Sequence, residues 1–386
     1  MPLVAPERPR DDDCEPMTVH PTNSLDARTR AGLVTTLALS IFVGSSALAT
    51  EQVVSNAVRE AGSLPLTDLS ASLQEQYPSL RAMVIARGNC VAFEYYGRNI
   101  DMQTQSPMYS VTKSVLSILV GIAIDEGHLR PDQKLFEIFP EEFDEFTDPR
   151  ARDITVRDVL TKTEGFAENT WNEFNMGPRV AGKAQLWRWM LNRRVEHPAG
   201  TRFSYDNVGS DLLSVVLSRA IKQRAADYAK RKLFEPLHID NYTWLSDSEG
   251  HLYGEMGLNI TARDMAKIGI LYLQHGRWDG KQIVSESYVR ESVSAHNGGG
   301  PPVNASYGYQ WWVSKTATGL NAFFAAGYKG QLITVFPEQN LVIAVAADTT
   351  PGGSRKLIND VALPAAAQLT GTAPCIVQLG RPHSTD

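Results

Sequence analysis

A serine and a lysine three residues apart, in Ser110-Val-Thr-Lys113, have the types and spacing that suit nucleophilic chemistry. They open an apolar run that continues to Ile124, and this pattern predicts a helix. Residues three apart share one helical face, so the lysine amine can take the proton of the serine hydroxyl. Burial and the helix N-terminus both favour the neutral amine that this requires. For the pair alone, a capping serine beside an exposed lysine is the alternative.

A second polar group, Tyr205-Asp-Asn207, follows the turn Pro198-Ala-Gly200 and precedes an apolar helical run. The turn and the short aromatic stretch predict a loop tip rather than a core strand. In an extended loop, side chains two residues apart point the same way. A phenol can relay a proton, and a carboxamide can bond both a lysine and a substrate amide. The alternative is a packed tyrosine with a turn-forming asparagine.

The third group is Ala325-Ala-Gly327-Tyr-Lys-Gly330-Gln331, which leads into two β-rich runs joined by Pro337-Glu-Gln-Asn340. Two such runs around a polar turn predict an antiparallel hairpin. Glycines where the first strand opens allow a ligand to approach the backbone closely. A strand-edge N–H there, together with the N–H of Ser110, would form an oxyanion hole. An ordinary glycine turn is the alternative.

Taken in this order, the three groups resemble the motifs of the serine β-lactamase and penicillin-recognising superfamily. The resemblance is closest to its class C-like branch, with the class VIII-type esterases and the 6-aminohexanoate-dimer hydrolases. Three other stretches resemble landmarks of that branch: residues 153–165, 257–269 and 307–312. The similarity covers roughly residues 75 to 350.

The resemblance implies a role for each matching residue. Ser110 would be the nucleophile and Lys113 its base. Tyr205 would relay the proton, and Asn207 would orient substrate and lysine. The backbone N–H groups of Ser110 and Gln331 would form the oxyanion hole.

One departure from the family pattern bears on the substrate. Where β-lactamases of this branch have Lys or His, then Thr or Ser, then Gly, this chain has Tyr328-Lys329-Gly330. Tyr328 and Gly330 would line the substrate, and a phenol holds a β-lactam carboxylate less strongly than a cation does. We therefore expect an exported serine hydrolase of small carboxylic esters or amides. The alternatives are a β-lactamase, a D,D-peptidase-like penicillin-binding protein, or a non-catalytic peptidoglycan-sensing module.

Composition and motifs limit the other classes. A formal net charge of −6 gives no reason to expect a nucleic-acid partner. The histidines form no H-E-x-x-H and no Cys/His ligand spacing, so neither a metal nor another cofactor is expected. The absence of G-x-S-x-G argues against an α/β-hydrolase. The expected partner is a small ester or amide.

The N-terminus has the pattern of a secretory signal. Arg28-Thr-Arg30 precedes an apolar run over 31–43, and Ala47-Leu-Ala49 supplies a small-residue cleavage site. We expect residues 1–49 to be a leader cleaved after Ala49, with translation starting at Met1 or Met17. The mature protein would be periplasmic or secreted, with no stable membrane span.

Cysteine usage leaves little to infer. Removal of the leader discards Cys14 and leaves Cys90 and Cys375. An oxidising compartment permits a bridge between them, but two cysteines so far apart in sequence do not prove one. The sequence leaves the pairing open, and two free thiols are the safer expectation.

The elements that must position the three groups follow from the periodicity. A hairpin is expected around Arg87-Gly-Asn89, mostly helical structure from Ser110 to about Leu273, then further strands and a final helix over 354–369. This order predicts an α+β fold: an antiparallel sheet flanked by helices with a large helical insert. The α/β sandwich part would comprise residues 50–108 and 274–370, the helical part 109–273, and the C-terminal tail 371–386. Ser110 would lie at the junction of the two parts.

Overall fold

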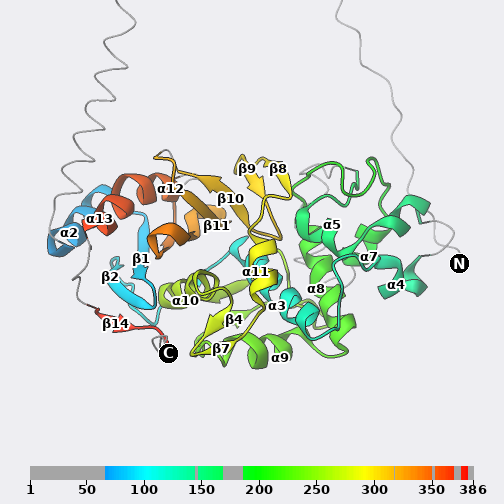
Figure 1. The fold of residues 1–386 in the computed structure, drawn as a ribbon, viewed down its shortest axis with the longest axis horizontal. Coiled ribbons are helices and arrows are strands. Elements are labelled where there is room, and N and C mark those ends of the chain that lie inside the picture. The colour runs from blue at the N-terminus through cyan, green and yellow to red at the C-terminus, as the bar shows by residue number, and fades with distance from the viewer. Residues whose placement is uncertain are drawn as a thin grey trace, which may run out of the picture. The chain divides into compact units, whose positions relative to one another are not determined.

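A nine-stranded antiparallel sheet forms the centre of the described chain (Figure 1). The structure is a computed structural model that describes residues 66–143, 147–167, 186–316, 318–349, 353–368 and 375–380. In spatial order the strands are β14 (Val377–Gln378), β2 (Cys90–Tyr96), β1 (Leu80–Arg87), β13 (Leu341–Ala347), β12 (Gln331–Phe336), β11 (Asn321–Gly327), β10 (Trp312–Lys315), β9 (Ala305–Tyr307) and β8 (Asn297–Gly300).

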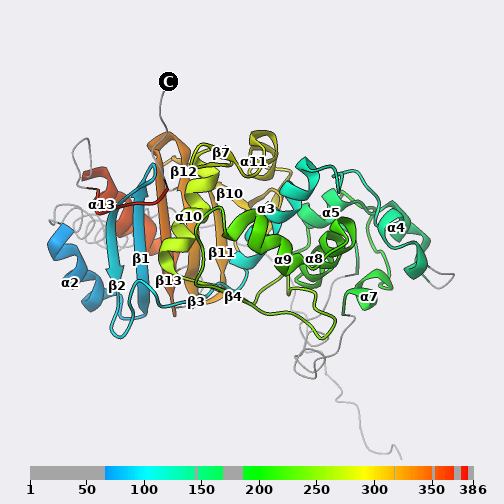
Figure 2. The ribbon, with the colours of Figure 1, turned by 90° about the horizontal axis from the view of Figure 1, so that it is seen from below.

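Alternate residues of the central strands enter two hydrophobic cores, as the pleat of a strand requires. In β1, Val84 and Ala86 belong to the core that includes α3 (Val111–Asp125) and α10 (Ala262–Leu273). Met83 and Ile85 belong to the core of the opposite face. The helices of that face are α2 (Leu66–Gln76), α12 (Gly353–Leu357) and α13 (Leu363–Gln368). Figure 2 shows α10 on one face of the sheet and α2 and α13 on the other.

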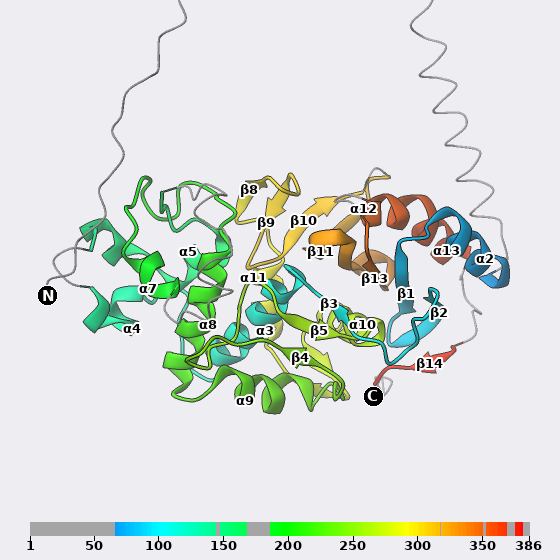
Figure 3. The ribbon, with the colours of Figure 1, turned by 180° about the vertical axis from the view of Figure 1, so that it is seen from behind.

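A helical part lies beside α3, which packs between β11 and α8 (Figures 2 and 3). Its helices are α4 (Leu135–Ile138), α5 (Val156–Thr161), α7 (Leu186–Leu191), α8 (Val208–Ile221) and α9 (Ala225–Ala229). Helix α3 is enclosed on every side, since residues 111–123 are all buried. The remaining elements are α11 (Glu286–Ser292), the small sheet β3 (Ser106–Pro107), β5 (Leu258–Ile260) and β4 (Thr243–Trp244), and the pair β6 (Arg277–Trp278) and β7 (Lys281–Gln282).

The predicted α+β fold, an antiparallel sheet with helices and a helical insert, is confirmed. The predicted hairpin around Gly88 is β1–β2, and the later one is β12–β13. Two details differ from the expected division of the chain. Helix α10 falls in the predicted helical part, yet it packs on β12 and β13. Residues 375–380 fall in the predicted tail, yet they contain β14, which pairs with β2.

The prediction of two free thiols is wrong, because Cys90 and Cys375 form a disulfide with a Cα–Cα distance of 5.4 Å. Cys90 begins β2 and Cys375 precedes β14, so the bridge fastens the end of the chain to the sheet. Sequence separation concealed the pairing: the two residues lie 285 positions apart.

The predicted leader, residues 1–49, lies outside the described residues. Among the residues that are described, no helix is both long enough and apolar enough to span a membrane.

Replacing Cys375 by serine should lower the free energy of unfolding by roughly 2–4 kcal/mol, because the bridge restricts the unfolded chain. Chemical denaturation of oxidised wild type and variant measures the difference. Activity should persist, since β14 is the edge strand five places from β11 in the sheet. Wild type treated with a reductant is the matched control, because reduction breaks the same bridge and should lower its stability to that of the variant. Equal stability of Cys375→Ser and wild type would contradict the bridge.

Candidate active site

The turn that carries Ser110 is held by the small sheet. Strand β3 pairs with β5, and the Met108 N–H donates to the Leu258 carbonyl at 2.8 Å. Tyr109 then adopts φ +46°, a conformation that is costly for a bulky side chain and that recurs at functional sites. Ser110 returns to helical angles, φ −68° and ψ −8°, and α3 begins at the next residue. The serine is thus presented at the first turn of a buried helix.

Lys113 lies one helical turn further on, as the spacing predicts. Its Nζ is 3.0 Å from Ser110 Oγ, and the residue is only 1% exposed. The same Nζ donates to the Glu255 carbonyl at 2.9 Å. Burial penalises a charged amine, and the hydroxyl lies within reach of direct proton transfer. The pair therefore has the geometry of a nucleophile with its base.

Asp211 of α8 fixes the carbonyl that Lys113 meets. Its buried Oδ1 accepts the backbone N–H groups of Gly254 at 2.9 Å and Glu255 at 3.1 Å. The sequence analysis missed both Asp211 and Glu255. The signal available for Asp211 was its place one turn into the helix that follows Tyr205-Asp-Asn207.

Tyr205 completes the cluster. Its phenol is hydrogen-bonded to Ser110, and its ring stacks on Trp312 at a centroid distance of 5.6 Å. Lys113 Nζ lies 5.3 Å from the ring centroid. Burial raises the pKa of Tyr205, and the hydrogen bond to Ser110 opposes this effect. The group is therefore a neutral phenol near pH 7, able to donate one proton and accept another.

Asn207 occupies the N-cap of α8. Its side-chain oxygen is buried and has no hydrogen-bond partner among the described residues. A buried acceptor of this kind usually finds a donor, so it is able to receive a substrate N–H. The structure thus brings Ser110, Lys113 and Tyr205 together, and the side-chain oxygen of Asn207, two residues after Tyr205, has no hydrogen-bond partner among the described residues.

In the glycine-rich hairpin, Gly327 lies against the residues that precede Ser110. A Cβ at Gly327 would lie 2.4 Å from the Met108 carbonyl oxygen, so only glycine fits. Gly330 was predicted to line the substrate. A Cβ at this position would lie 2.2 Å from Ser354 Oγ, so there is no room for a side chain. The Gln331 side chain is buried and donates to the Ala347 carbonyl of β13. Gly327, to which the sequence analysis gave no role of its own, is therefore the glycine of the hairpin that packs against the Ser110 turn.

The tip of the same hairpin is exposed. Tyr328 is 61% exposed and meets the ring of Tyr109 edge-on at 5.5 Å. Lys329 has φ +60°, and its Nζ lies 2.9 Å from Asp348 Oδ1. This ion pair raises the pKa of Lys329. The hairpin thus presents the Tyr328 ring against Tyr109, the residue before Ser110, and its lysine is paired with Asp348.

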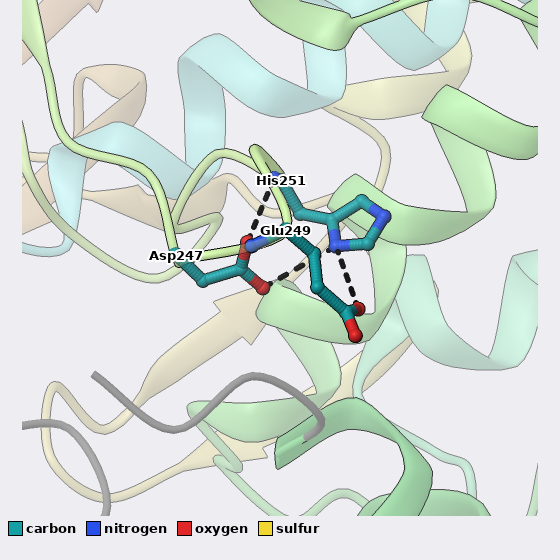
Figure 4. Close-up of side chains that lie close together, drawn as sticks. All are labelled: Asp247, Glu249 and His251. Carbon is teal, nitrogen blue, oxygen red and sulfur yellow. Dashed lines mark hydrogen bonds and ion pairs between the residues drawn. The ribbon is translucent and has the colours of Figure 1, made fainter. Parts of the chain in front are cut away.

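One group among the described residues, Asp247, Glu249 and His251, has side chains of the types that bind metals (Figure 4). Asp247 Oδ1 accepts the N–H groups of Glu249 and His251, each at 2.9 Å. His251 Nδ1 lies 3.3 Å from Asp247 Oδ2 and 3.7 Å from a Glu249 oxygen. These contacts explain the cluster as a hydrogen-bonded turn between Ser246 and Leu252.

With the geometry established, comparison with known proteins decides the family. The family model described as Beta-lactamase matches residues 50–367. The chain belongs to the Beta-lactamase family. The predicted resemblance to the serine β-lactamase and penicillin-recognising superfamily is confirmed, and the protein is a serine hydrolase of that family.

Relatives of this Beta-lactamase family member include hydrolases and penicillin-binding protein homologues. The 6-aminohexanoate-dimer hydrolase of Paenarthrobacter ureafaciens is 26% identical over 297 residues, which cover 72% of this chain and 74% of that protein. A putative 6-aminohexanoate-dimer hydrolase from Bacillus anthracis has a TM-score of 0.65 at 20% identity, covering 79% of this chain and 82% of that one. The octameric penicillin-binding protein homologue from Pyrococcus abyssi has a TM-score of 0.62 at 19% identity, covering 78% and 77%.

Replacing Lys113 by arginine should reduce kcat/KM by about 10²–10⁴-fold, because a guanidinium cannot act as a base near pH 7. Lys113→Met tests the same loss without the bulk of the guanidinium, and Lys222→Arg at an exposed position is the matched control. Steady-state hydrolysis of a chromogenic ester gives the comparison, with circular dichroism to establish folding. Full activity in a folded Lys113→Arg variant would point to another base.

Proposed function

We propose that the protein hydrolyses small carboxylic esters or amides through an acyl-enzyme on Ser110. Lys113 acts as the general base and Tyr205 as the proton relay. The observation that carries the proposal is the 3.0 Å contact between Lys113 Nζ and Ser110 Oγ inside a buried site. A binding module would have no use for a buried amine directed at a serine.

The acylation step follows from these contacts. As Ser110 Oγ attacks the substrate carbonyl carbon, its proton passes to Lys113 Nζ. The phenol of Tyr205, bonded to Ser110, passes a proton to the departing alcohol or amine and regains one from Lys113. In deacylation, water attacks the acyl carbon and gives a proton to Lys113 or Tyr205. The bond from the acyl carbon to Ser110 Oγ then breaks, the carboxylic acid leaves, and the proton returns to Ser110 Oγ.

The oxyanion formed in each step needs donors at the first turn of α3. The N–H of Ser110 is one, as expected from the sequence. A backbone N–H of the hairpin between Gly327 and Gln331 supplies the second donor. The sequence analysis expected the N–H of Gln331, whereas the close approach of Gly327 to Met108 supports an N–H near Gly327. Removing one such donor typically costs about 10²–10³ in kcat.

The substrate class rests on the hairpin tip. Tyr328 offers an aromatic surface and one neutral hydrogen bond, and Lys329 is held by Asp348. A β-lactam carboxylate is therefore not matched by a cation on this tip, whereas an uncharged acyl chain can lie against Tyr109 and Tyr328. The relative named 6-aminohexanoate-dimer hydrolase makes a linear amide dimer a second candidate beside short-chain esters.

We also propose that the protein is exported to the periplasm or secreted. The basic segment, apolar run and Ala47-Leu-Ala49 site have the order of a cleavable signal. The bridge between Cys90 and Cys375 supports an oxidising compartment.

Ser110→Ala should abolish ester hydrolysis and labelling by a fluorophosphonate, while the fold remains. Loss of one hydroxyl at a helix start costs only about 1 kcal/mol of stability. Turnover, intact mass after labelling and thermal melting, measured on wild type and variant, distinguish the effects. Ser287→Ala, at an exposed serine of α11, is the control. Wild-type-like turnover in Ser110→Ala would overturn the assignment.

Short-chain ester hydrolysis should exceed β-lactam hydrolysis by at least about tenfold, since charge-assisted hydrogen bonds are roughly twice as strong as neutral ones. The measurement compares kcat/KM for p-nitrophenyl butyrate and nitrocefin on one preparation. Asp348→Asn, which removes the ion-pair partner of Lys329, should lower the ratio of kcat/KM for the ester to kcat/KM for nitrocefin. Lys329→Ala should leave this ratio unchanged. A preference for nitrocefin in wild type would replace this assignment with that of a β-lactamase.

A further inference from the structure

Two buried charged side chains, Lys162 and Glu164, lie beneath the Tyr205 loop and take no part in the steps above. We propose that they are a positioning pair: Lys162 clamps the backbone on both sides of Tyr205, and the charges of the two set how readily Lys113 takes a proton. This inference rests on the proposed function, since it concerns the activation of Ser110.

The clamp is formed by one residue. Lys162 ends α5 in the left-handed conformation, φ 61° and ψ 42°, and is completely buried. Its carbonyl accepts the Ser204 N–H at 2.9 Å, and its Nζ donates to the Asp206 carbonyl. Tyr205 lies between these two anchored neighbours. Fixing the backbone before and after a residue limits where its side chain can point, so Lys162 holds the phenol near Ser110.

A second contact of Lys162 connects the clamp to the other helices of the site. Its Nζ donates to Ser210 Oγ in α8 at 2.8 Å, and Ser210 Oγ donates to Gln310 Oε1 at 2.9 Å. The Gln310 amide donates to the carbonyls of Val159 and Leu160 in α5, at 2.9 and 3.0 Å. The Gln310 carbonyl accepts Ser114 Oγ of α3 at 2.6 Å. One buried network thus joins the Tyr205 loop to the helix that carries Lys113.

Glu164 occupies a space that the sequence leaves open for it. A Cβ at Gly209 would lie 2.2 Å from Glu164 Oε1, so the glycine makes room for the carboxyl group. That oxygen is buried and accepts no hydrogen bond from the described residues. Burial raises the pKa of Glu164 to about 8, with the charge of Lys162 opposing the rise. Burial also lowers the pKa of Lys162, with Glu164 opposing the fall.

The charges reach the proposed catalytic groups directly. Groups on several elements face the pair: Lys113 of α3, Tyr205 and Asp206 of the loop, Asp158 of α5 and Tyr307 of β9. The buried Glu255, before β5, also acts on Tyr205 through its charge, and it stays unchanged in both variants. Asp206 is itself paired with Arg193 at 2.6 Å. A positive Lys162 disfavours a second positive charge on Lys113, whereas a negative Glu164 favours it. Removing Lys162 should therefore raise the pH at which Lys113 loses its proton, and removing Glu164 should lower it. Two residues with a purely structural role would not produce opposite shifts.

The experiment measures the rate of Ser110 labelling by a fluorophosphonate from about pH 5 to about pH 10. In Lys162→Met the midpoint of the rise should move up by about one pH unit, and the plateau should fall by about tenfold. In Glu164→Gln the midpoint should move to lower pH, by a smaller amount than the upward shift in Lys162→Met, because burial keeps the Glu164 carboxyl partly protonated. Lys222→Met is the matched control: Lys222 also ends a helix at φ 53°, but it is exposed. Its profile should equal wild type.

Each outcome has one meaning. Folded variants with the wild-type midpoint, or with midpoints moved in the same direction, would overturn the proposal. If Lys162→Met does not fold, Glu164→Gln alone decides, because an unchanged or raised midpoint contradicts the charge effect. Failure of wild type to label at Ser110 would instead overturn the proposed function and this inference with it.

Discussion

The site depends on the burial of an amine beside a hydroxyl. Lys113 is enclosed at the first turn of α3, where water cannot compensate its charge and Ser110 Oγ and the Glu255 carbonyl are its hydrogen-bond partners. Burial keeps the amine neutral because a charge without water is unfavourable. A loose site would admit water, and the amine would then return to its ordinary charged state. The neighbouring elements therefore have to exclude water from Lys113.

Three parts of the chain form the enclosure. The small sheet presents Ser110 through the strained Tyr109, and α8 supplies Asp211, which holds the Glu255 carbonyl. Helix α3 is anchored along its length as well, because Ser117 Oγ donates to the Tyr309 carbonyl at 2.7 Å. Polar side chains inside an apolar helix are tolerated when each has a partner, and these partners hold α3 in one orientation.

The sequence predicted what depends on near neighbours. Short apolar runs on either side of turn residues predicted the hairpins β1–β2 and β12–β13, and the three-residue spacing predicted the contact of Ser110 with Lys113. It did not predict what depends on residues far apart. The Cys90–Cys375 bridge, the support of Asp211 for Glu255 and the network through Gln310 join segments that no local period connects. Lys162 and Glu164 lie in the stretch 153–165, and the sequence assigned them no role because their burial follows only from the fold.

The central claim is that an acyl group is carried by Ser110, and rapid mixing with p-nitrophenyl butyrate tests it most directly. The account predicts that quenched samples contain protein heavier by one butyryl group, with the added mass on the peptide that contains Ser110, and that the adduct disappears as substrate is exhausted. Steady turnover without any adduct, or an adduct on another residue, would contradict it.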